Sequence, residues 1–269
     1  MTTYGSAARL ASSDLPPPPT SIPANCALFL DLDGTLAPIM PRPEDVGPDA
    51  ARAALIARLR EAFDDRVAVI SGRSLDDLSR ILGEGSLAYM AGVHGLERRT
   101  PEGVFRAQPH EGLAEARDVL ADLARCDRGL IFEDKHLSVG LHYRNTPSAA
   151  DAVIEAAERL KRQTGLVLQL GDMVAELRTP GQDKGSSVAA LLREPAFDGA
   201  LPIFIGDDLT DEDGFEAARR LGGYGVLVGP ERPTAASYRL DGPEAVHAWL
   251  DAAARSIAGQ SVAESEVIR

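Results

Sequence analysis

The stretch ALFLDLDGTLAP, residues 27–38, determines how the rest of the chain is interpreted. A run of apolar residues ends in two aspartates, Asp31 and Asp33, which are followed by glycine and threonine. Two carboxylates this close repel each other, and they lose solvation where a core strand takes them out of water. A neighbouring cation would offset both costs.

Composition and charge limit the classes of function. The chain has 269 residues, enough for one large domain or two smaller ones, and 44% of them are hydrophobic. No apolar run approaches the roughly 20 residues that a membrane span needs, and the N-terminus lacks the basic-then-apolar order of a signal peptide. The net charge of −13 argues against nucleic acid or an anionic membrane as the main partner. Local cations can still attract an anionic substrate.

The cysteines and the chain ends complete this outline. Cys26 and Cys126 have no metal-ligand spacing, so we predict free thiols in a reducing cytoplasm. Residues 1–22 are polar and proline-rich. They predict a disordered leader, whose PPPP segment is either a spacer or a partner-binding motif. Residues 259–269 are expected to form a flexible tail.

Short apolar runs alternate with helical patterns over most of the chain. Strands are predicted at residues 26–32, 67–70, 87–91, 201–205 and 225–228. Helices are predicted near residues 48–62, 74–82, 184–193, 210–220 and 243–255. This alternation is typical of an α/β protein with a doubly wound parallel sheet. Such sheets bind ligands outside the carboxyl ends of their strands.

The middle of the chain has a different pattern. Residues 95–106 fit a turn between two short strands, and residues 137–144 and 173–178 alternate apolar with polar. Helical patterns lie near 111–125 and 147–163. We therefore predict an α/β core formed by residues 23–100 and 181–258. An inserted α+β domain of residues 101–180 interrupts it, with helices covering one face of its sheet.

Two familiar explanations of DLDGT fail. A calcium-binding loop that starts at Asp31 needs glycine at its sixth position and glutamate at its twelfth. Those positions hold Leu36 and Arg42. A P-loop is excluded as well, because the chain has no GxxxxGK[ST] motif.

A second acidic cluster follows the predicted strand at 201–205. It contains Asp207, Asp208 and Asp211. These residues could simply decorate a helix N-terminus. Two such clusters at strand ends of one sheet instead favour convergence on one cation. Oxygen ligands of this kind fit Mg²⁺, and a carboxylate beside a hard cation can attack phosphorus.

Two further features suit a phosphate group. VISGRS, residues 69–74, ends a predicted strand with Ser71 and the backbone N–H groups around Gly72. GQDKGSS, residues 181–187, places Lys184 at the start of a predicted helix, where its charge opposes the helix dipole. Phosphate neutralisation therefore explains Lys184 better than a structural role does.

The order DxDGT, strand-ending serine, helix-starting lysine and GDDxxD resembles the haloacid dehalogenase-like phosphohydrolases. The resemblance covers residues 25–258 and implies a Rossmann-like core with an inserted cap. It implies that Asp31 is the nucleophile and Asp33 the general acid/base, and that Ser71, Gly72 and Lys184 bind phosphate. The implied metal ligands are Asp31, the carbonyl of Asp33 and Asp207, supported by Asp208 or Asp211.

A narrower resemblance is carried by SGR (71–73), GVHGLE (92–97), HYR (142–144), ELRTPGQDKG (176–185) and GDDLTDEDGF (206–215). These segments are similar to the trehalose-6-phosphate phosphatase family. That implies Mg²⁺-dependent hydrolysis of trehalose 6-phosphate to trehalose and phosphate. The substrate-binding residues implied are Arg73, His94, Glu133, Lys135, His142, Arg144 and Glu176.

Several alternatives stay open. Asp172 lies where the family commonly has a basic residue, so related substrates remain: sucrose 6-phosphate, or glucosyl- or mannosyl-3-phosphoglycerate. A non-catalytic sugar-phosphate sensor would have lost Asp31, Lys184 or Asp207, and none is lost. His94 fits a core turn as well as the cleft. The sequence does not show whether a trehalose-phosphate synthase binds.

Overall fold

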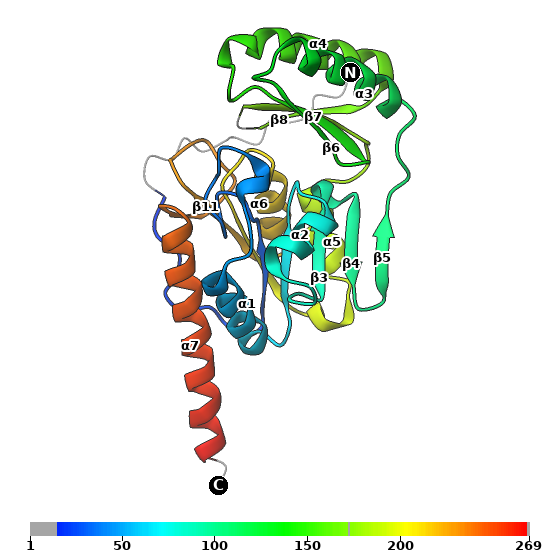
Figure 1. Cartoon of the computed structure of the whole chain (residues 1–269). Coiled ribbons are helices and arrows are strands. Elements are labelled where there is room, and N and C mark those ends of the chain that lie inside the picture. The colour runs from blue at the N-terminus through cyan, green and yellow to red at the C-terminus, as the bar shows by residue number, and fades with distance from the viewer. Residues whose placement is uncertain (1–14, 172, 268–269) are drawn as a thin grey trace, which may run out of the picture.

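The protein is built from two units, a larger α/β core and a smaller cap (Figure 1). The computed structural model describes residues 15–171 and 173–267, so Asp172 lies outside the described residues. The core contains an eight-stranded sheet and the cap a four-stranded sheet. The predicted fold class, a doubly wound parallel sheet with an inserted α+β domain, is confirmed.

Strand β1 lies in the middle of the core sheet, whose order is β12-β11-β10-β1-β2-β3-β4-β5. The pairs from β12 to β3 are parallel, and the last two pairs are antiparallel. The strands are β1 (Cys26–Leu30), β2 (Val67–Ile70), β3 (Tyr89–Gly92), β4 (Glu97–Thr100), β5 (Gly103–Arg106), β10 (Leu201–Gly206), β11 (Tyr224–Val228) and β12 (Tyr238–Leu240). From β1 the chain continues to β2 on one side, and from β10 it continues to β11 on the other side. The topological switch point therefore lies between β1 and β10.

Helices cover both faces of the core sheet. They are α1 (Ala50–Ala62), α2 (Leu75–Leu82) and α7 (Pro243–Val267), and α5 (Lys184–Leu191) and α6 (Asp211–Arg220). Leu28 and Leu30 of β1 belong to one buried cluster, with α1, α2 and α7. Phe29 belongs to a second cluster, with Val188 of α5 and Phe215 of α6. A strand buried on both faces must be apolar throughout, which is why β1 reads CALFL.

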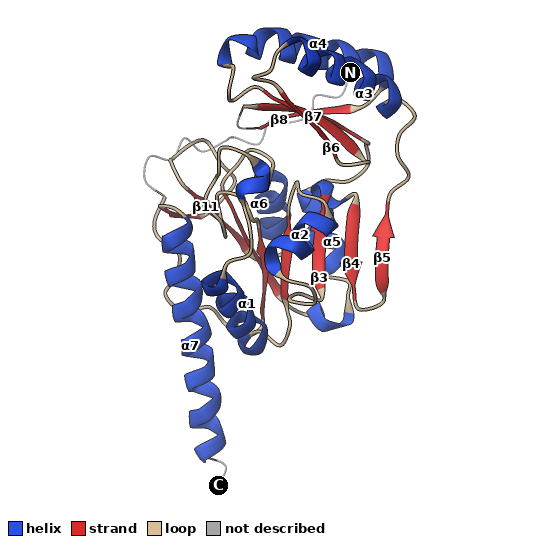
Figure 2. Ribbon diagram, in the orientation of Figure 1, coloured by secondary structure: helices blue, strands red, loops and turns tan. Residues whose placement is uncertain are grey.

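The cap sheet has the order β6-β7-β9-β8, and all its pairs are antiparallel. Its elements are α3 (Leu113–Cys126), β6 (Ile131–Asp134), β7 (Ser138–His142), α4 (Ala150–Thr164), β8 (Val167–Gly171) and β9 (Val174–Arg178). Val139 and Leu141 of β7 pack against both cap helices. The helices cover the outer face of the sheet, and the opposite face looks toward the core (Figure 2).

The insert begins later than predicted. Strand β5 pairs with β4, and β4 pairs with β3, so residues 101–106 belong to the core sheet and not to the cap. The turn between two short strands was predicted, but a local pattern does not say which sheet a hairpin joins. Strands β6, β8 and β12 were not predicted, since they are short and largely half-buried.

The proline-rich segment is not disordered where the structure describes it. The backbone N–H of Arg239 donates to the carbonyl of Pro16 at 3.0 Å, and Trp249 Nε1 donates to that of Pro19 at 2.8 Å. Pro18 is buried and Leu15 packs against the core. The expectation of a disordered leader is therefore wrong for residues 15–22, while residues 1–14 lie outside the described part.

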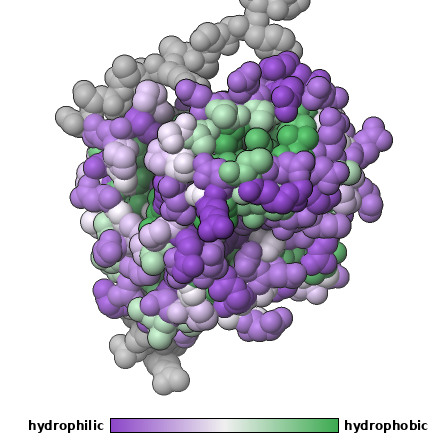
Figure 3. Space-filling view, turned by 45° about the horizontal axis from the view of Figure 1, so that its top comes forward, coloured by the Kyte–Doolittle hydropathy of each residue, from purple (hydrophilic) through white to green (hydrophobic). Residues whose placement is uncertain are grey.

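The C-terminal end also differs from expectation. Helix α7 extends to Val267, so the irregular tail expected from residue 259 is helical up to that point. Among the described residues, no helix is long and apolar enough to cross a membrane. The face shown in Figure 3 is mostly hydrophilic, in keeping with a net charge of −13.

Trp249→Phe tests whether the proline segment is anchored. The indole N–H is lost while most of the ring packing is kept, so the free energy of unfolding should fall by about 1 kcal/mol. Urea denaturation followed by circular dichroism measures this change. Limited proteolysis within residues 15–22 should also become faster. Unchanged stability together with unchanged proteolysis would show that the bond to Pro19 does not hold the segment.

Candidate active site

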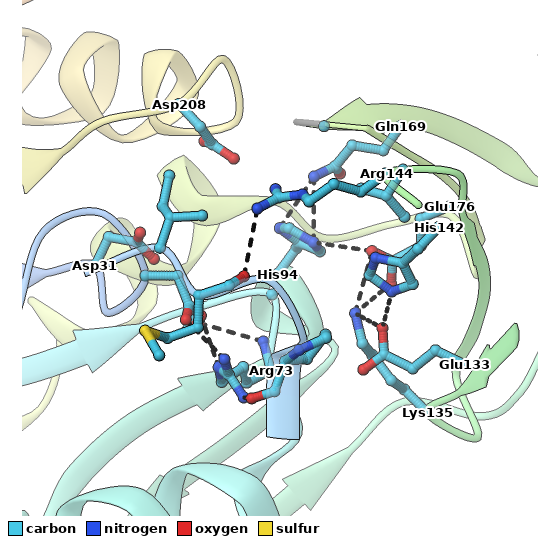
Figure 4. Close-up of a pocket in the computed structure, with 18 of the residues that line it drawn as sticks. Asp31, Arg73, His94, Glu133, Lys135, His142, Arg144, Gln169, Glu176 and Asp208 are labelled. Carbon is cyan, nitrogen blue, oxygen red and sulfur yellow. Dashed lines mark hydrogen bonds and ion pairs between the residues drawn. The ribbon is translucent and has the colours of Figure 1, made fainter. Parts of the chain in front are cut away.

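A cleft of about 200 Å³ lies between the core and the cap (Figure 4). Its floor is the switch point of the core sheet. Asp31 directly follows β1, and its backbone N–H donates to Ile205 of β10 at 2.9 Å, which continues the parallel ladder. Asp31, Asp207 and Asp211 each place a carboxylate oxygen within 4.8 Å of the others. The predicted convergence of Asp31 and Asp207 therefore occurs.

Asp207 is the carboxylate with the fewest partners in this group. Its Oδ1 is buried and has no hydrogen-bond partner among the residues that the structure describes. Burial, with the nearby charges of Asp211 and Asp208, raises the pKa of Asp207 from 3.8 to about 8. Gly34 makes room for it, because a Cβ at Gly34 would lie 2.1 Å from Asp207 Oδ2. Gly34 also has φ +82°, which favours glycine.

Lys184 compensates part of the negative charge. Its Nζ donates to Asp31 Oδ1 at 2.9 Å and to Asp211 Oδ1 at 2.6 Å, and its side chain is only 2% exposed. Burial opposes the charge on Lys184, but Asp211 and Asp31 outweigh it and raise the pKa of Lys184 well above 10.5. Asp183 caps helix α5 through a capping box with Ser186, which fixes the start of the helix at Lys184.

Asp211 and Asp208 organise the loop between β10 and α6. Asp211 Oδ2 accepts hydrogen bonds from the backbone N–H groups of Asp207 and Asp208, at 2.9 and 3.0 Å. Asp208 Oδ1 accepts from the backbone and hydroxyl of Thr210. The carboxylate of Asp208 lines the cleft but has one oxygen committed to the loop, a role that sequence reasoning did not foresee.

Asp33 and Arg73 form an ion pair at the edge of the same floor. Arg73 Nε and Nη2 donate to the two carboxylate oxygens of Asp33 at 2.6 and 2.7 Å. Arg73 also donates to the carbonyl of Pro43, so its side chain is fixed. Arg73 was expected to bind substrate; in this structure it lines the cleft and orients Asp33.

Ser71, Gly72 and His94 lie beside the carboxylates. Ser71 is buried at the end of β2. The imidazole of His94 occupies the space over Gly72, where a Cβ would come within 2.7 Å of His94 Nε2. Val93 and His94 both adopt positive φ, +46° and +54°, and such strain in residues other than glycine is concentrated at functional sites. His94 is thus buried in a turn and lines the cleft at once, so both interpretations of it hold.

The cap contributes a chain of paired charges. Lys135 Nζ lies 3.2 Å from Glu176 and 3.3 Å from Glu133, and His142 Nε2 lies 2.9 Å from Glu133. Ser138 donates to Glu176 at 2.5 Å. Burial opposes ionisation of Glu176, but Lys135 and the hydrogen bonds outweigh it and hold the pKa of Glu176 far below 4.5. Glu133, Lys135, His142 and Glu176 lie on the side of the cap that faces the cleft (Figure 4).

Polar contacts near the cleft join the cap to the core. His94 Nε2 lies 3.7 Å from Glu176, Gln169 Nε2 lies 3.1 Å from His94 Nε2, and Arg144 donates to the carbonyl of Met40 at 3.3 Å. Arg178 fixes the amide of Gln169 with a 3.1 Å bond to Oε1. Sequence reasoning missed Gln169, because it belongs to a strand that was not predicted.

The floor of the cleft fits a divalent cation. Three carboxylates lie close together, and Lys184 balances only part of their charge. Within the described part of the chain, no group donates a hydrogen bond to the buried Oδ1 of Asp207. An all-oxygen donor set of this kind suits Mg²⁺ better than softer metals. Asp31 and Asp207 are the residues best placed to hold it, since the oxygens of Asp211 are occupied by Lys184 and the loop amides.

Comparison with known proteins assigns the family. The family model described as trehalose-phosphatase matches residues 29–244. The chain belongs to the trehalose-phosphatase family. Membership in this family makes the protein a phosphatase, an enzyme that hydrolyses phosphoric monoesters.

Individual members of the trehalose-phosphatase family are similar over most of their length. Trehalose-6-phosphate phosphatase of Escherichia coli strain K12 is 40% identical over 233 residues, covering 85% of this chain and 86% of that protein. The probable trehalose-phosphate phosphatase of Sinorhizobium fredii is 34% identical, covering 78% and 80%. The crystal structure of a trehalose-6-phosphate phosphatase related protein matches with a TM-score of 0.69 and 27% identity, covering 87% and 99%.

Asp207→Asn tests whether the negative charge of the three carboxylates exceeds the positive charge of Lys184. The pKa of Asp207 is raised in the folded state, so the folded protein holds more protons than the unfolded one between pH 4 and pH 8. Ionisation of Asp207 therefore lowers the free energy of unfolding of the natural protein as pH rises through this window. In EDTA at pH 8 the variant should unfold at a temperature higher by about 5 °C, with the difference vanishing near pH 4.

Added Mg²⁺ should stabilise the natural protein and leave Asp207→Asn unchanged, because only the folded carboxylates bind the ion. Asp76→Asn, which alters a side chain 90% exposed, is the control. It should melt as the natural protein does in EDTA and be stabilised by Mg²⁺ to the same extent. Equal melting temperatures of Asp207→Asn and the natural protein across the pH range would contradict the unbalanced charge.

Proposed function

We propose that the protein hydrolyses trehalose 6-phosphate to trehalose and phosphate, with Mg²⁺ and through an aspartyl phosphate on Asp31. The convergence of Asp31, Asp207 and Lys184 at the end of the central strands carries the proposal. The similarity to trehalose-phosphate phosphatases over most of the chain supports the substrate.

The reaction proceeds in two displacements. A carboxylate oxygen of Asp31 attacks phosphorus, and the bond from phosphorus to the sugar oxygen breaks. Asp33 must enter the first step protonated; it gives that proton to the leaving sugar oxygen and takes one back from a water molecule in the second step. That water attacks phosphorus, the bond to Asp31 breaks, and phosphate leaves. Asp31 and Asp207 would hold Mg²⁺, whose charge would stabilise the negative charge on the transferred phosphoryl group.

The chain's own groups complete the phosphate site. Lys184 already contacts Asp31 Oδ1, so it reaches a phosphoryl group attached there. Ser71 and the backbone at Gly72 line the same part of the cleft and offer hydrogen bonds to phosphate oxygens. Asp33 lines the cleft together with Asp31, and its carboxylate is oriented by Arg73.

The cap would hold the sugar. Glu133, Lys135, His142 and Glu176 face the cleft with charged donors and acceptors, which bind sugar hydroxyls well. Arg144 and His94 border the same space. The cleft of about 200 Å³ is smaller than the ~300–1,000 Å³ of typical ligand pockets. Movement of the cap away from the core would widen this space for a disaccharide phosphate, and closure would exclude water from the first step.

The fold alone does not identify the substrate among related sugar phosphates; their rates of hydrolysis do. Sucrose 6-phosphate and glucosyl- or mannosyl-3-phosphoglycerate share the phosphate chemistry and differ in the groups that the cap contacts. A non-catalytic sensor is disfavoured, since every residue the reaction needs is present. The cytoplasmic location and any association with a synthase remain predictions from the sequence.

The reaction itself gives a prediction. With Mg²⁺, phosphate should be released from trehalose 6-phosphate with a kcat/KM at least tenfold above that for the three alternative substrates. EDTA or Asp31→Asn should abolish release. Acid quenching with ³²P-labelled substrate should leave label on the natural protein and none on Asp31→Asn. Release without any protein-bound label at several quench times would refute the covalent step.

Glu176→Gln separates sugar binding from phosphate chemistry. Glu176 touches the cap groups and His94 but none of the carboxylates of the floor. Its loss should lower kcat/KM for trehalose 6-phosphate about 100-fold, as expected for a buried charged hydrogen bond. Hydrolysis of p-nitrophenyl phosphate, which has no sugar, should change less than about threefold. An equal loss on both substrates would place Glu176 in the chemistry instead.

A further inference from the structure

The backbone of the loop that carries Asp207 is bound by Arg232, a residue outside every motif of the sequence. We call this contact the brace. This loop, residues 207–210, joins β10 to α6. Arg232 Nη2 donates to the carbonyl of Asp208 at 2.6 Å and lies 3.4 Å from that of Asp207. Arg232 belongs to the segment between β11 and β12, so it reaches the loop from a different part of the chain.

Glu212 holds Arg232 in this position. Arg232 Nη1 donates to Glu212 Oε1, and Glu212 Oε2 accepts from the backbone N–H of Ala235 at 2.7 Å. Arg232 and Glu212 are 19% and 23% exposed, so the pair is largely shielded from water. One guanidinium thereby ties together the loop carbonyls, the first turn of α6 and the segment after β11.

The brace acts on the two residues whose backbone N–H groups are already bound. Asp211 Oδ2 accepts from the N–H groups of Asp207 and Asp208, and Arg232 takes up their carbonyls. The loop needs such support, because the charges of Asp208, Asp211 and Asp31 surround Asp207 and repel it. Without the brace, repulsion can relax by moving the loop outward, away from Asp31.

We propose that Arg232, oriented by Glu212, is a positioning residue that keeps Asp207 within shared reach of a divalent cation with Asp31. Arg232 touches the backbone of the loop and not the cleft, since it is not among the residues that line it. The proposal rests on the cation site of the proposed function. It assigns to Arg232 and Glu212 the role of fixing the loop that carries Asp207. Groups that orient ligand residues from outside typically change metal affinity about 10–100-fold.

The sign of the effect distinguishes positioning from simple electrostatics. A guanidinium close to a cation site repels the cation, so its removal by charge alone would tighten binding. Loss of positioning weakens binding instead. Arg232→Lys keeps the charge and loses the two-pronged geometry, which isolates the geometric contribution.

The experiment is calorimetric titration of the substrate-free protein with Mg²⁺, repeated with Mn²⁺. Arg232→Ala should weaken binding about tenfold, and Arg232→Lys should weaken it in the same direction. The variant Arg232→Ala/Glu212→Gln should be no weaker than Arg232→Ala, because both residues act through one contact. Arg58→Ala is the matched control: it breaks a 2.8 Å ion pair with Asp251, outside the cleft, and should bind as the natural protein does.

A kinetic readout supplements the titration. The Mg²⁺ concentration for half-maximal activity should rise in Arg232→Ala, while KM for the sugar phosphate at saturating Mg²⁺ stays unchanged. Melting curves in EDTA show whether each variant is folded. If Arg232→Ala does not fold, Arg232→Lys and Glu212→Gln carry the test.

Unchanged or tighter Mg²⁺ binding by the folded Arg232 variants would overturn the proposal. So would the absence of any Mg²⁺ or Mn²⁺ binding by the natural protein, since the cation site itself would then fail. Cation binding by a natural protein that does not hydrolyse trehalose 6-phosphate would refute the proposed substrate and leave the role of Arg232 intact.

Discussion

The structure depends on the burial of several carboxylates at the ends of two neighbouring parallel strands. Strands β1 and β10 are apolar on both faces, so polar groups first appear where they end. Their register pairs Leu30 with Ile205, which brings the following Asp31 and Asp207 to one point. Lys184 balances part of the charge there. A divalent cation would balance the rest. The uncompensated negative charge of the buried acids therefore favours binding of a cation at this point.

The same constraint explains the glycines around the floor. A Cβ at Gly34 would meet Asp207, and one at Gly206 would lie 2.2 Å from the carboxyl carbon of Asp211. Gly72 similarly leaves room for His94. Each glycine gives its space to a functional side chain of another segment, which is a reason for glycine beyond backbone freedom. The close packing of the floor therefore depends on glycine at residues 34, 72 and 206.

The sequence predicted the central strands and the floor residues because their patterns are local. Buried parallel strands are continuous apolar runs, and acids at their ends stand out. Features that depend on distant partners were not predictable. The proline segment packs on distant parts of the chain, where Trp249 and Arg239 bind its carbonyls. The brace of Arg232 involves a loop with no motif. Gln169 belongs to a strand too weakly patterned to recognise, yet it joins the cap to His94.

The separation of chemistry from recognition has a physical basis in this fold. The floor is fixed by the core sheet, whereas the cap groups are already paired with one another as Glu133 with His142 and Lys135 with Glu176. A ligand must replace those pairings with its own hydroxyls or leave buried charges unsatisfied, which costs 1–3 kcal/mol or more for each group. In the proposed reaction, discrimination among substrates would therefore come from hydroxyls that fit the cap. The floor, which contacts only the phosphate in the proposed reaction, can stay the same while the cap changes what is admitted.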